Sequence, residues 1–204
     1  MDLKSTYNRI AEDWDNDHTN DTWWKDGVNK FTSLIPGGSS VLDVGCGSGV
    51  KSELLHAKGF AVTGIDFSEK FLDIARRRMP TGDFRLIDLY NISGLDKKFD
   101  AIFAQAVLLH VPKKDIVSVI HSLTAKLSPG GLFYVAVKEQ RAEEQEEEVV
   151  KESDYGYEYE RFFSYFTIEE IKSYLTHEGL EIVYESVAHS GRRNWIQAIG
   201  KLAG

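Results

Sequence analysis

Three aspartates end short apolar segments of the sequence, and each has the chemistry to bind part of one ligand. Asp43 lies in the run VLDVGCGSG, Asp66 in GIDFS and Asp88 in LIDL. A glycine-rich turn between a buried strand and a helix lets a ligand lie against the main chain and meet the helix amides. The residues after Asp43 have this composition, so we expect a ligand site at this turn.

The glycine turn lacks the features that bind phosphates. A dinucleotide site needs Gly-x-Gly-x-x-Gly, but the sixth position is Val50 when counted from Gly45 and Ser52 when counted from Gly47. The Gly-Lys-Ser/Thr of a triphosphate loop is also missing from the turn. An acid at Asp43 is a poor neighbour for phosphate, which favours a ligand that carries an ammonium or sulfonium group.

The other two aspartates suit a nucleoside. A carboxylate at Asp66 can accept both hydroxyls of a ribose, and one at Asp88 can accept an exocyclic adenine amine. Structural alternatives exist for these motifs. Asp88 could only cap a short helix over 89–92, and the glycines could form only a tight turn. The three acids occur in order at successive strand ends, which favours one shared ligand site at the edge where open α/β sheets bind ligands.

Short β-rich segments alternate with helix-length segments from residue 41 onwards. The pattern predicts strands over 41–44, 61–65, 83–87, 99–104 and 132–138, and helices over 48–58, 68–78 and 113–127. Strands as apolar as 101–104 are typical of a parallel sheet that helices cover on both faces. We therefore expect a doubly wound α/β fold with a mostly parallel sheet.

Further elements flank this core. Helices are expected over 3–14, 23–34 and 167–178, the last with a capping box between Thr167 and Glu170. Strands over 180–187 and 195–199 should pair antiparallel, because the link between them is too short for a parallel crossover. We expect a single domain over 1–204, divided into N-terminal helices (1–36), a ligand-binding core (37–139), an acidic and aromatic insertion (140–166) and a C-terminal helix and hairpin (167–204).

These motifs together resemble the class I S-adenosylmethionine-dependent methyltransferases, most strongly over 41–139. The resemblance implies a seven-stranded sheet of order 3-2-1-4-5-7-6 with strand seven antiparallel, and S-adenosylmethionine as cofactor without a metal. It also implies a role for each matching residue: the methionine part near Asp43, Gly45, Cys46 and Gly47, the ribose at Asp66, the adenine at Phe67, Asp88 and Leu89, and the methionine carboxylate beside Gln105.

The acceptor is expected to be a small molecule. Nucleic-acid methyltransferases that act on exocyclic amines carry Asn/Asp-Pro-Pro-aromatic after strand four, where this chain has AQAV, and its single cysteine precludes a nucleophilic cysteine there. The net charge is −8, and the segment 138–160 contributes ten acids against three bases. No basic surface for a phosphate backbone is therefore expected. The acceptor atom, oxygen, nitrogen or sulfur, stays open.

A hydroxyl acceptor would need a general base, and His110 at the end of strand four is the best candidate. Its alternative is a histidine hydrogen-bonded in the turn after the strand. The expected acceptor pocket combines this residue with aromatic and cationic side chains outside the sheet, namely Tyr7, Trp14, His110, Tyr159, Arg161 and Phe162. We expect Phe163 and Phe166 to pack in the core.

The acidic segment 140–160 has two interpretations. It could form, with the N-terminal helix, a movable cover that excludes water from the acceptor site, or it could be a solvated helix over 143–152. A second function class also stays open, namely a methyltransferase-fold protein that binds cofactor or a partner without turnover. No apolar run approaches the ~18 residues of a membrane span, so we expect a cytoplasmic monomer or homodimer without membrane or nucleic-acid partners.

Overall fold

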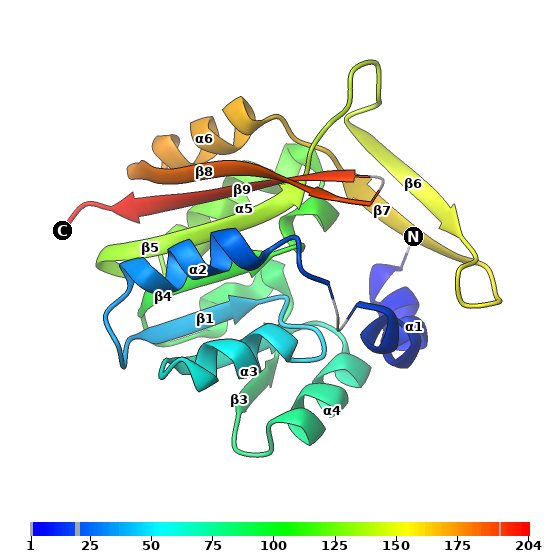
Figure 1. Ribbon diagram of the computed structural model, residues 1–204, viewed down its shortest axis with the longest axis horizontal. Coiled ribbons are helices and arrows are strands. Elements are labelled where there is room, and N and C mark those ends of the chain that lie inside the picture. Colours follow the sequence, from blue (N-terminus) through cyan, green and yellow to red (C-terminus); the bar gives the residue numbers. More distant parts are fainter. Residues whose placement is uncertain (1, 19–20, 192) are drawn as a thin grey trace.

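The computed structural model describes residues 2–18, 21–191 and 193–204. Its centre is a seven-stranded sheet of order β3-β2-β1-β4-β5-β9-β8 (Figure 1). The strands are β1 (Ser40–Val44), β2 (Ala61–Asp66), β3 (Asp83–Leu86), β4 (Phe99–Gln105), β5 (Leu127–Lys138), β8 (Leu180–Ser190) and β9 (Arg193–Leu202). The first five run parallel, and β9 pairs antiparallel with both β5 and β8. The expected order and the antiparallel seventh strand are confirmed.

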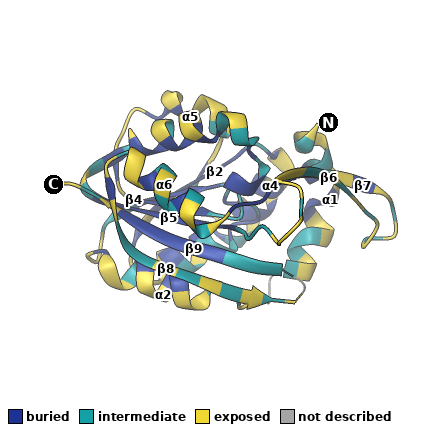
Figure 2. Ribbon diagram, turned by 90° about the horizontal axis from the view of Figure 1, so that it is seen from above, coloured by how far each residue is buried: buried dark blue, intermediate teal, exposed yellow. Residues whose placement is uncertain are grey.

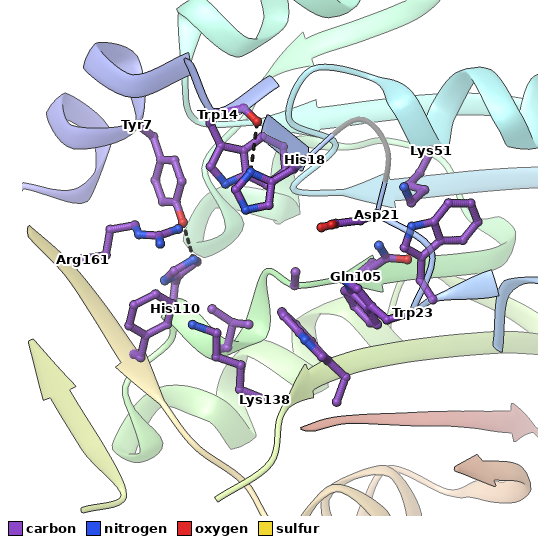
Figure 3. Close-up of a pocket in the computed structure, with 15 residues that line it drawn as sticks. Tyr7, Trp14, His18, Asp21, Trp23, Lys51, Gln105, His110, Lys138 and Arg161 are labelled. Carbon is purple, nitrogen blue, oxygen red and sulfur yellow. Dashed lines mark hydrogen bonds between the residues drawn. The ribbon is translucent and has the colours of Figure 1, made fainter. Parts of the chain in front are cut away.

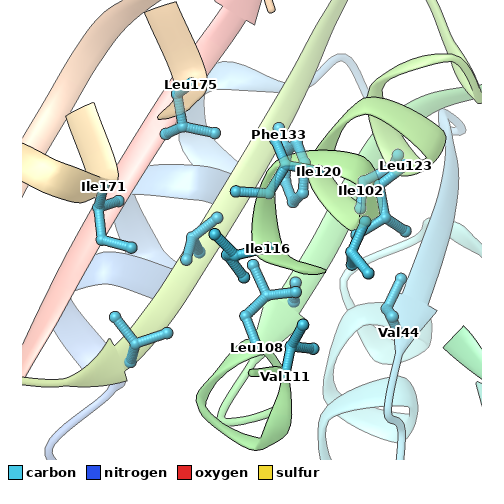
Figure 4. Packing of buried hydrophobic residues seen from close by; sticks show 14 of the residues in the cluster. Val44, Ile102, Leu108, Val111, Ile116, Ile120, Leu123, Phe133, Ile171 and Leu175 are labelled. Carbon is cyan, nitrogen blue, oxygen red and sulfur yellow. The ribbon is translucent and has the colours of Figure 1, made fainter. Parts of the chain in front are cut away.

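Helices cover both faces of this sheet. They are α2 (Lys25–Leu34), α3 (Val50–Ala57), α4 (Glu69–Arg78), α5 (Lys113–Thr124) and α6 (Ile168–His177), with two short 3-10 helices, η1 (Leu89–Gly94) and η2 (Leu108–His110). Side chains alternate between the faces along β4, as the period of a strand requires. Ile102 belongs to the same buried cluster as Ile116 of α5 and Leu175 of α6 (Figure 4), whereas Phe103 lies on the other face against Phe31 of α2.

Burial follows the same layers. In Figure 2 the central strands are buried and the outer faces of the helices are exposed. The edge strand β8 alternates between intermediate and exposed residues, because only one of its faces meets the core. Among the described residues, no helix is long and apolar enough to cross a membrane.

The acidic segment forms a β-hairpin and not a helix. Strands β6 (Glu147–Glu152) and β7 (Tyr159–Ser164) pair antiparallel, so the helical interpretation of 143–152 is wrong. Alternate residues of β6 are half-buried, and their charges have partners: Glu152 pairs with Arg161, and Glu148 accepts a hydrogen bond from the Tyr165 hydroxyl. The ion pair neutralises one charge of the acidic run, and the hydrogen bond gives a second carboxylate a partner, so the segment can pack as a hairpin.

The N-terminal helix α1 (Leu3–His18) lies across the ligand edge of the sheet, next to α4 and the hairpin (Figure 1). Three ion pairs join it to α4, between Lys4 and Glu69 (2.6 Å), Glu12 and Arg77 (2.6 Å) and Asp15 and Arg78 (2.8 Å). The Tyr157 hydroxyl in the hairpin turn donates to Asp13 (2.7 Å). Helix and hairpin together therefore cover the carboxyl ends of the strands.

Candidate active site

The glycine turn between β1 and α3 is held by Asp66. Gly45 and Gly47 have φ angles of +66° and +51°, which L side chains rarely adopt. The Asp66 carboxylate accepts hydrogen bonds from the amide of Gly47 (2.9 Å) and from that of Ser68 (2.8 Å). Burial raises the pKa of Asp66 to about 6, although these amides oppose the shift. The strand end and the turn are thus fixed to each other.

A cleft of about 80 Å³ runs along this turn. Five residues expected to bind the cofactor line it: Gly45, Gly47, Asp66, Phe67 and Gln105. A neighbouring cavity of about 270 Å³ is lined by the expected adenine residues Asp88 and Leu89, and it shares Phe67 and His110 with the cleft. Asp88 also caps η1 by accepting a hydrogen bond from the Tyr90 amide (2.9 Å), so the expected helix cap is present.

Two expected cofactor residues do not line these spaces. Asp43 is 2% exposed and accepts a hydrogen bond from the Ser52 hydroxyl (2.6 Å). Burial raises its pKa to about 7. Cys46 packs against Leu72 and Met79, and burial raises the pKa of its thiol. The structure gives both residues contacts that support the turn from behind.

Three observations indicate that the cleft suits S-adenosylmethionine. A Cβ added to Gly47 would meet no heavy atom closer than Phe71 Cδ1 at 4.0 Å, so the space above this glycine is open. The side-chain oxygen of Gln105 is buried without a hydrogen-bond partner in the described chain and can accept from an ammonium group. A carboxylate has about four acceptor sites. The Gly47 and Ser68 amides each bond to a different oxygen of Asp66, so the carboxylate keeps acceptor capacity for a ribose hydroxyl.

A third cavity, of about 140 Å³, opens beside the cleft and is rich in aromatic side chains (Figure 3). All four tryptophans of the chain line it: Trp14, Trp23, Trp24 and Trp195. The Trp23 and Trp195 rings stack with their centroids 4.0 Å apart, and Trp14 stacks on His18 at 4.3 Å. We call this space the aromatic cavity.

The cleft and the aromatic cavity share a wall. Tyr7, Trp14, Gln105, Ala106 and His110 line both spaces. Ala106 has a φ of +55°, a conformation that a residue with a Cβ adopts only where the surroundings hold it. Its amide donates to the carbonyl of Ala136 on β5 (2.9 Å), which fixes the turn after β4. Because the two spaces share these lining residues, a group bound in the cleft would meet the aromatic cavity at this wall.

His110 is a neutral imidazole with a defined tautomer. Its Nδ1 donates to the carbonyl of Phe162 (2.7 Å), so its Nε2 accepts from the Tyr7 hydroxyl (2.6 Å; Figure 3). Burial lowers the pKa of His110 to about 3, and the charge of Arg161 acts in the same direction. Burial raises the pKa of Tyr7, with the Arg161 cation opposing. Arg161 itself forms a two-point ion pair with Glu152 at 2.5 Å.

The expected acceptor residues divide into two groups. Tyr7, Trp14, His110 and Arg161 line the aromatic cavity, whereas Tyr159 and Phe162 do not. Tyr159 packs against Tyr155 beneath α1, and Phe162 contributes its carbonyl. Phe163, expected in the core, is buried and also borders the cavity.

Sequence reasoning did not identify several lining residues, among them Trp23, Trp24, Lys51, Lys138 and Trp195. The clustering of tryptophans before residue 25 was a signal for the first two. Among the described residues, no three His, Cys, Asp or Glu side chains are arranged to hold a metal ion.

Comparison with known proteins agrees with this geometry. Residues 41–131 match a family model described as a methyltransferase domain. The chain is 37% identical over 116 residues to a ubiquinone biosynthesis O-methyltransferase of Dechloromonas aromatica, covering 54% of this chain and 48% of that protein. It is 38% identical over 112 residues to a trans-aconitate 2-methyltransferase of Variovorax paradoxus, covering 53% and 42%. The chain thus spans about half the length of the curated relatives it matches.

Solved structures extend the likeness to the whole fold. The 1,6-didemethyltoxoflavin-N1-methyltransferase of Burkholderia thailandensis superposes with a TM-score of 0.77 at 18% identity, over 99% of this chain and 88% of that one. The magnesium protoporphyrin IX methyltransferase of Synechocystis gives 0.72 at 19%, over 98% and 95%.

The sheet order and the glycine turn define a class I, Rossmann-like methyltransferase fold. Residues 41–131 of this fold match the methyltransferase domain that the family model describes.

Proposed function

We propose that the chain transfers a methyl group from S-adenosylmethionine to a small-molecule acceptor bound in the aromatic cavity. The observation that carries the proposal is the wall of five residues common to the cleft and the cavity. A cofactor held along the glycine turn would have its reactive end at this wall. The cofactor supplies an activated methyl group on a sulfonium, so the protein mainly has to position the two reactants and exclude water.

Different residues of the chain would bind different parts of the cofactor. Asp66 would bind the ribose hydroxyls, Asp88 and Leu89 the adenine edge, and Phe67 one adenine face. Gln105 would meet the charged methionine end through its unpartnered oxygen. Asp43 would act through Ser52, by holding the start of α3 against the strand.

The histidine in the wall favours acceptors that need no strong base. A general base works best when its pKa is near the operating pH, and the pKa of His110 is lowered to about 3. We therefore assign His110 the role of fixing the Tyr7 hydroxyl, through the hydrogen bond at its Nε2. Helix α1 and the β6–β7 hairpin, which bring Tyr7 and Arg161 to the cavity, would exclude water.

The alternative is cofactor or partner binding without turnover, and a partner could bind through the acidic segment if its carboxylates were free. Several of its acids have partners within the chain. Glu144 pairs with Arg193 (2.6 Å), Glu152 pairs with Arg161 (2.5 Å), and the Glu147 carboxylate accepts from the Lys113 amide (2.5 Å). These contacts favour a structural role for the segment and weaken the case for a partner.

Two linked measurements test the proposal. Calorimetric titration with S-adenosylhomocysteine should show one binding site per chain. The protein is then incubated with methyl-labelled S-adenosylmethionine and a protein-free metabolite extract, and mass spectrometry should detect a newly labelled small molecule. Binding without any labelled product would favour cofactor binding without turnover. No binding would exclude both methyl transfer and cofactor binding, and would leave only the partner-binding form of the alternative.

A further inference from the structure

Several cations line the aromatic cavity, and one of them, Lys138, has no ion-pair partner among the described residues. Lys51, Lys138 and Arg161 line it together with one carboxylate, Asp21. Arg161 is neutralised by Glu152. Within the described part of the chain, no carboxylate oxygen lies within 4.0 Å of the Lys138 ammonium, which instead lies 3.5 Å from the centre of the Phe163 ring. Among the described residues, the half-buried Lys138 therefore has an aromatic contact and no ion-pair partner.

The position of Lys138 relates it to the acceptor. Figure 3 shows Lys138 and Arg161 on the side of the cavity where Tyr7 and His110 lie, with Lys51 on the opposite side. Tyr7 and His110 belong to the wall shared with the cofactor cleft. An anionic group bound by Lys138 would thus hold the rest of an acceptor close to the methyl group.

In the protein without a ligand, the position of Lys138 disfavours the charged form of its side chain. Burial lowers its pKa to about 7, and the charge of Arg161 acts in the same direction. The other charged groups that act on it are Glu152, Glu148 and Arg193, so its surroundings hold both signs of charge. An anion bound at the ammonium would stabilise the charged form.

The walls of the cavity suit a flat ring. The stacked pairs of Trp23 with Trp195 and Trp14 with His18 present flat aromatic surfaces, against which a planar ligand stacks favourably. The volume is about 140 Å³, and a protein cavity of ~150 Å³ holds one benzene molecule. The space therefore suits a single six-membered ring with small substituents.

We propose that the acceptor is a molecule with one aromatic ring that bears an anionic oxygen, a carboxylate or a phenolate, and that Lys138 binds this anion. The inference rests on the proposed function and deepens it by naming the class of substrate. It makes Lys138 a specificity-determining residue.

Calorimetry with three probes tests this inference on the protein saturated with S-adenosylhomocysteine. Benzoate carries a carboxylate, pentafluorophenolate carries a phenolate, and benzamide is a neutral analogue of benzoate. The titrations are run at about pH 6.5, where a lysine with a pKa of about 7 is mostly protonated. At least one anion should bind roughly tenfold or more tightly than benzamide, as expected for a hydrogen bond to a charged group. The anion that binds identifies which of the two oxygens the site takes.

Two variants locate the effect. Lys138→Met keeps the length of the side chain and removes its charge, so the preference for the anion should disappear. Lys151→Met on β6 is the matched control, because Lys151 is exposed and does not line the cavity, and it should keep the preference. Equal binding of all three probes, no binding of any, or an unchanged preference in Lys138→Met would overturn the inference. Saturation with S-adenosylhomocysteine is measured first, so a failure of cofactor binding is seen separately.

Discussion

Gly47 offers a direct test of where the cofactor lies, because a single methyl group added there would enter the cleft. Its amide is held by Asp66 and its φ is +51°. An ideal Cβ would meet nothing nearer than 4.0 Å, so the protein itself has room for alanine. Gly47→Ala should therefore fold and yet bind the cofactor poorly.

Two costs of this substitution can be separated. The left-handed backbone of an alanine costs about 1–2 kcal/mol of stability. The added methyl group takes space that the cofactor needs, and such overpacking costs about 1–3 kcal/mol. The second cost affects only the complex, and it corresponds to a loss of affinity of roughly fivefold to 150-fold.

Gly59→Ala is the matched control. Gly59 has a φ of +89°, and a Cβ there would meet no atom within 4 Å. Denaturant unfolding should give similar losses of stability for the two variants. Calorimetry with S-adenosylhomocysteine should give a weakened complex only for Gly47→Ala. If Gly47→Ala binds as tightly as the parent, or if Gly59→Ala weakens binding equally, the cofactor does not lie over this turn.

Three further predictions follow from the same contacts. Asp66→Ala should weaken S-adenosylhomocysteine binding by about 1.5–3 kcal/mol, measured by calorimetric titration. It should also reduce stability by about 1–3 kcal/mol for each buried amide that it leaves unpaired, measured by urea unfolding. If neither measurement changes, Asp66 has neither role. Asp43→Asn should stabilise the fold relative to the parent by about 1–3 kcal/mol more at pH 8 than at pH 5. The folded pKa of Asp43, about 7, lies above the unfolded value of 3.8, so ionisation of the buried acid destabilises the parent as pH rises. Urea unfolding that gives the same difference in stability between variant and parent at pH 5 and at pH 8 would contradict this. Hydrogen exchange should slow in both 3–18 and 140–160 when S-adenosylhomocysteine binds, if helix and hairpin form a movable cover, whereas unchanged exchange in 140–160 would leave a passive hairpin.

Local signals were sufficient to predict the sheet and the glycine turn. The strands of the core are short apolar runs between turn residues, and each acid at a strand end follows its own strand directly in the sequence. The order of the sheet came from the family resemblance, and the antiparallel final pair from the short link before β9. These features depend on residues close together in the chain, which is why the sequence reveals them.

Features that depend on distant contacts could not be predicted in this way. Glu152 and Arg161 are neutralised only when β6 pairs with β7, so the charge run alone indicated a solvated segment. The aromatic cavity brings Trp23 beside Trp195, which lie far apart in the sequence. In the sequence, Lys138 is an ordinary lysine at the end of a predicted strand. Its contact with Phe163 of the hairpin forms only in the folded protein. The second role of Asp66, as the acceptor for two loop amides, likewise needed the folded turn.

The central claim is that a cofactor in the cleft presents its sulfur to the aromatic cavity at the wall formed by Tyr7, Gln105 and His110. A crystal structure of the protein with S-adenosylhomocysteine tests it most directly. We expect the ribose hydroxyls on Asp66, the adenine beside Asp88, and the sulfur at this wall, facing the tryptophans. A cofactor product bound elsewhere, or with its sulfur directed away from the aromatic cavity, would contradict it.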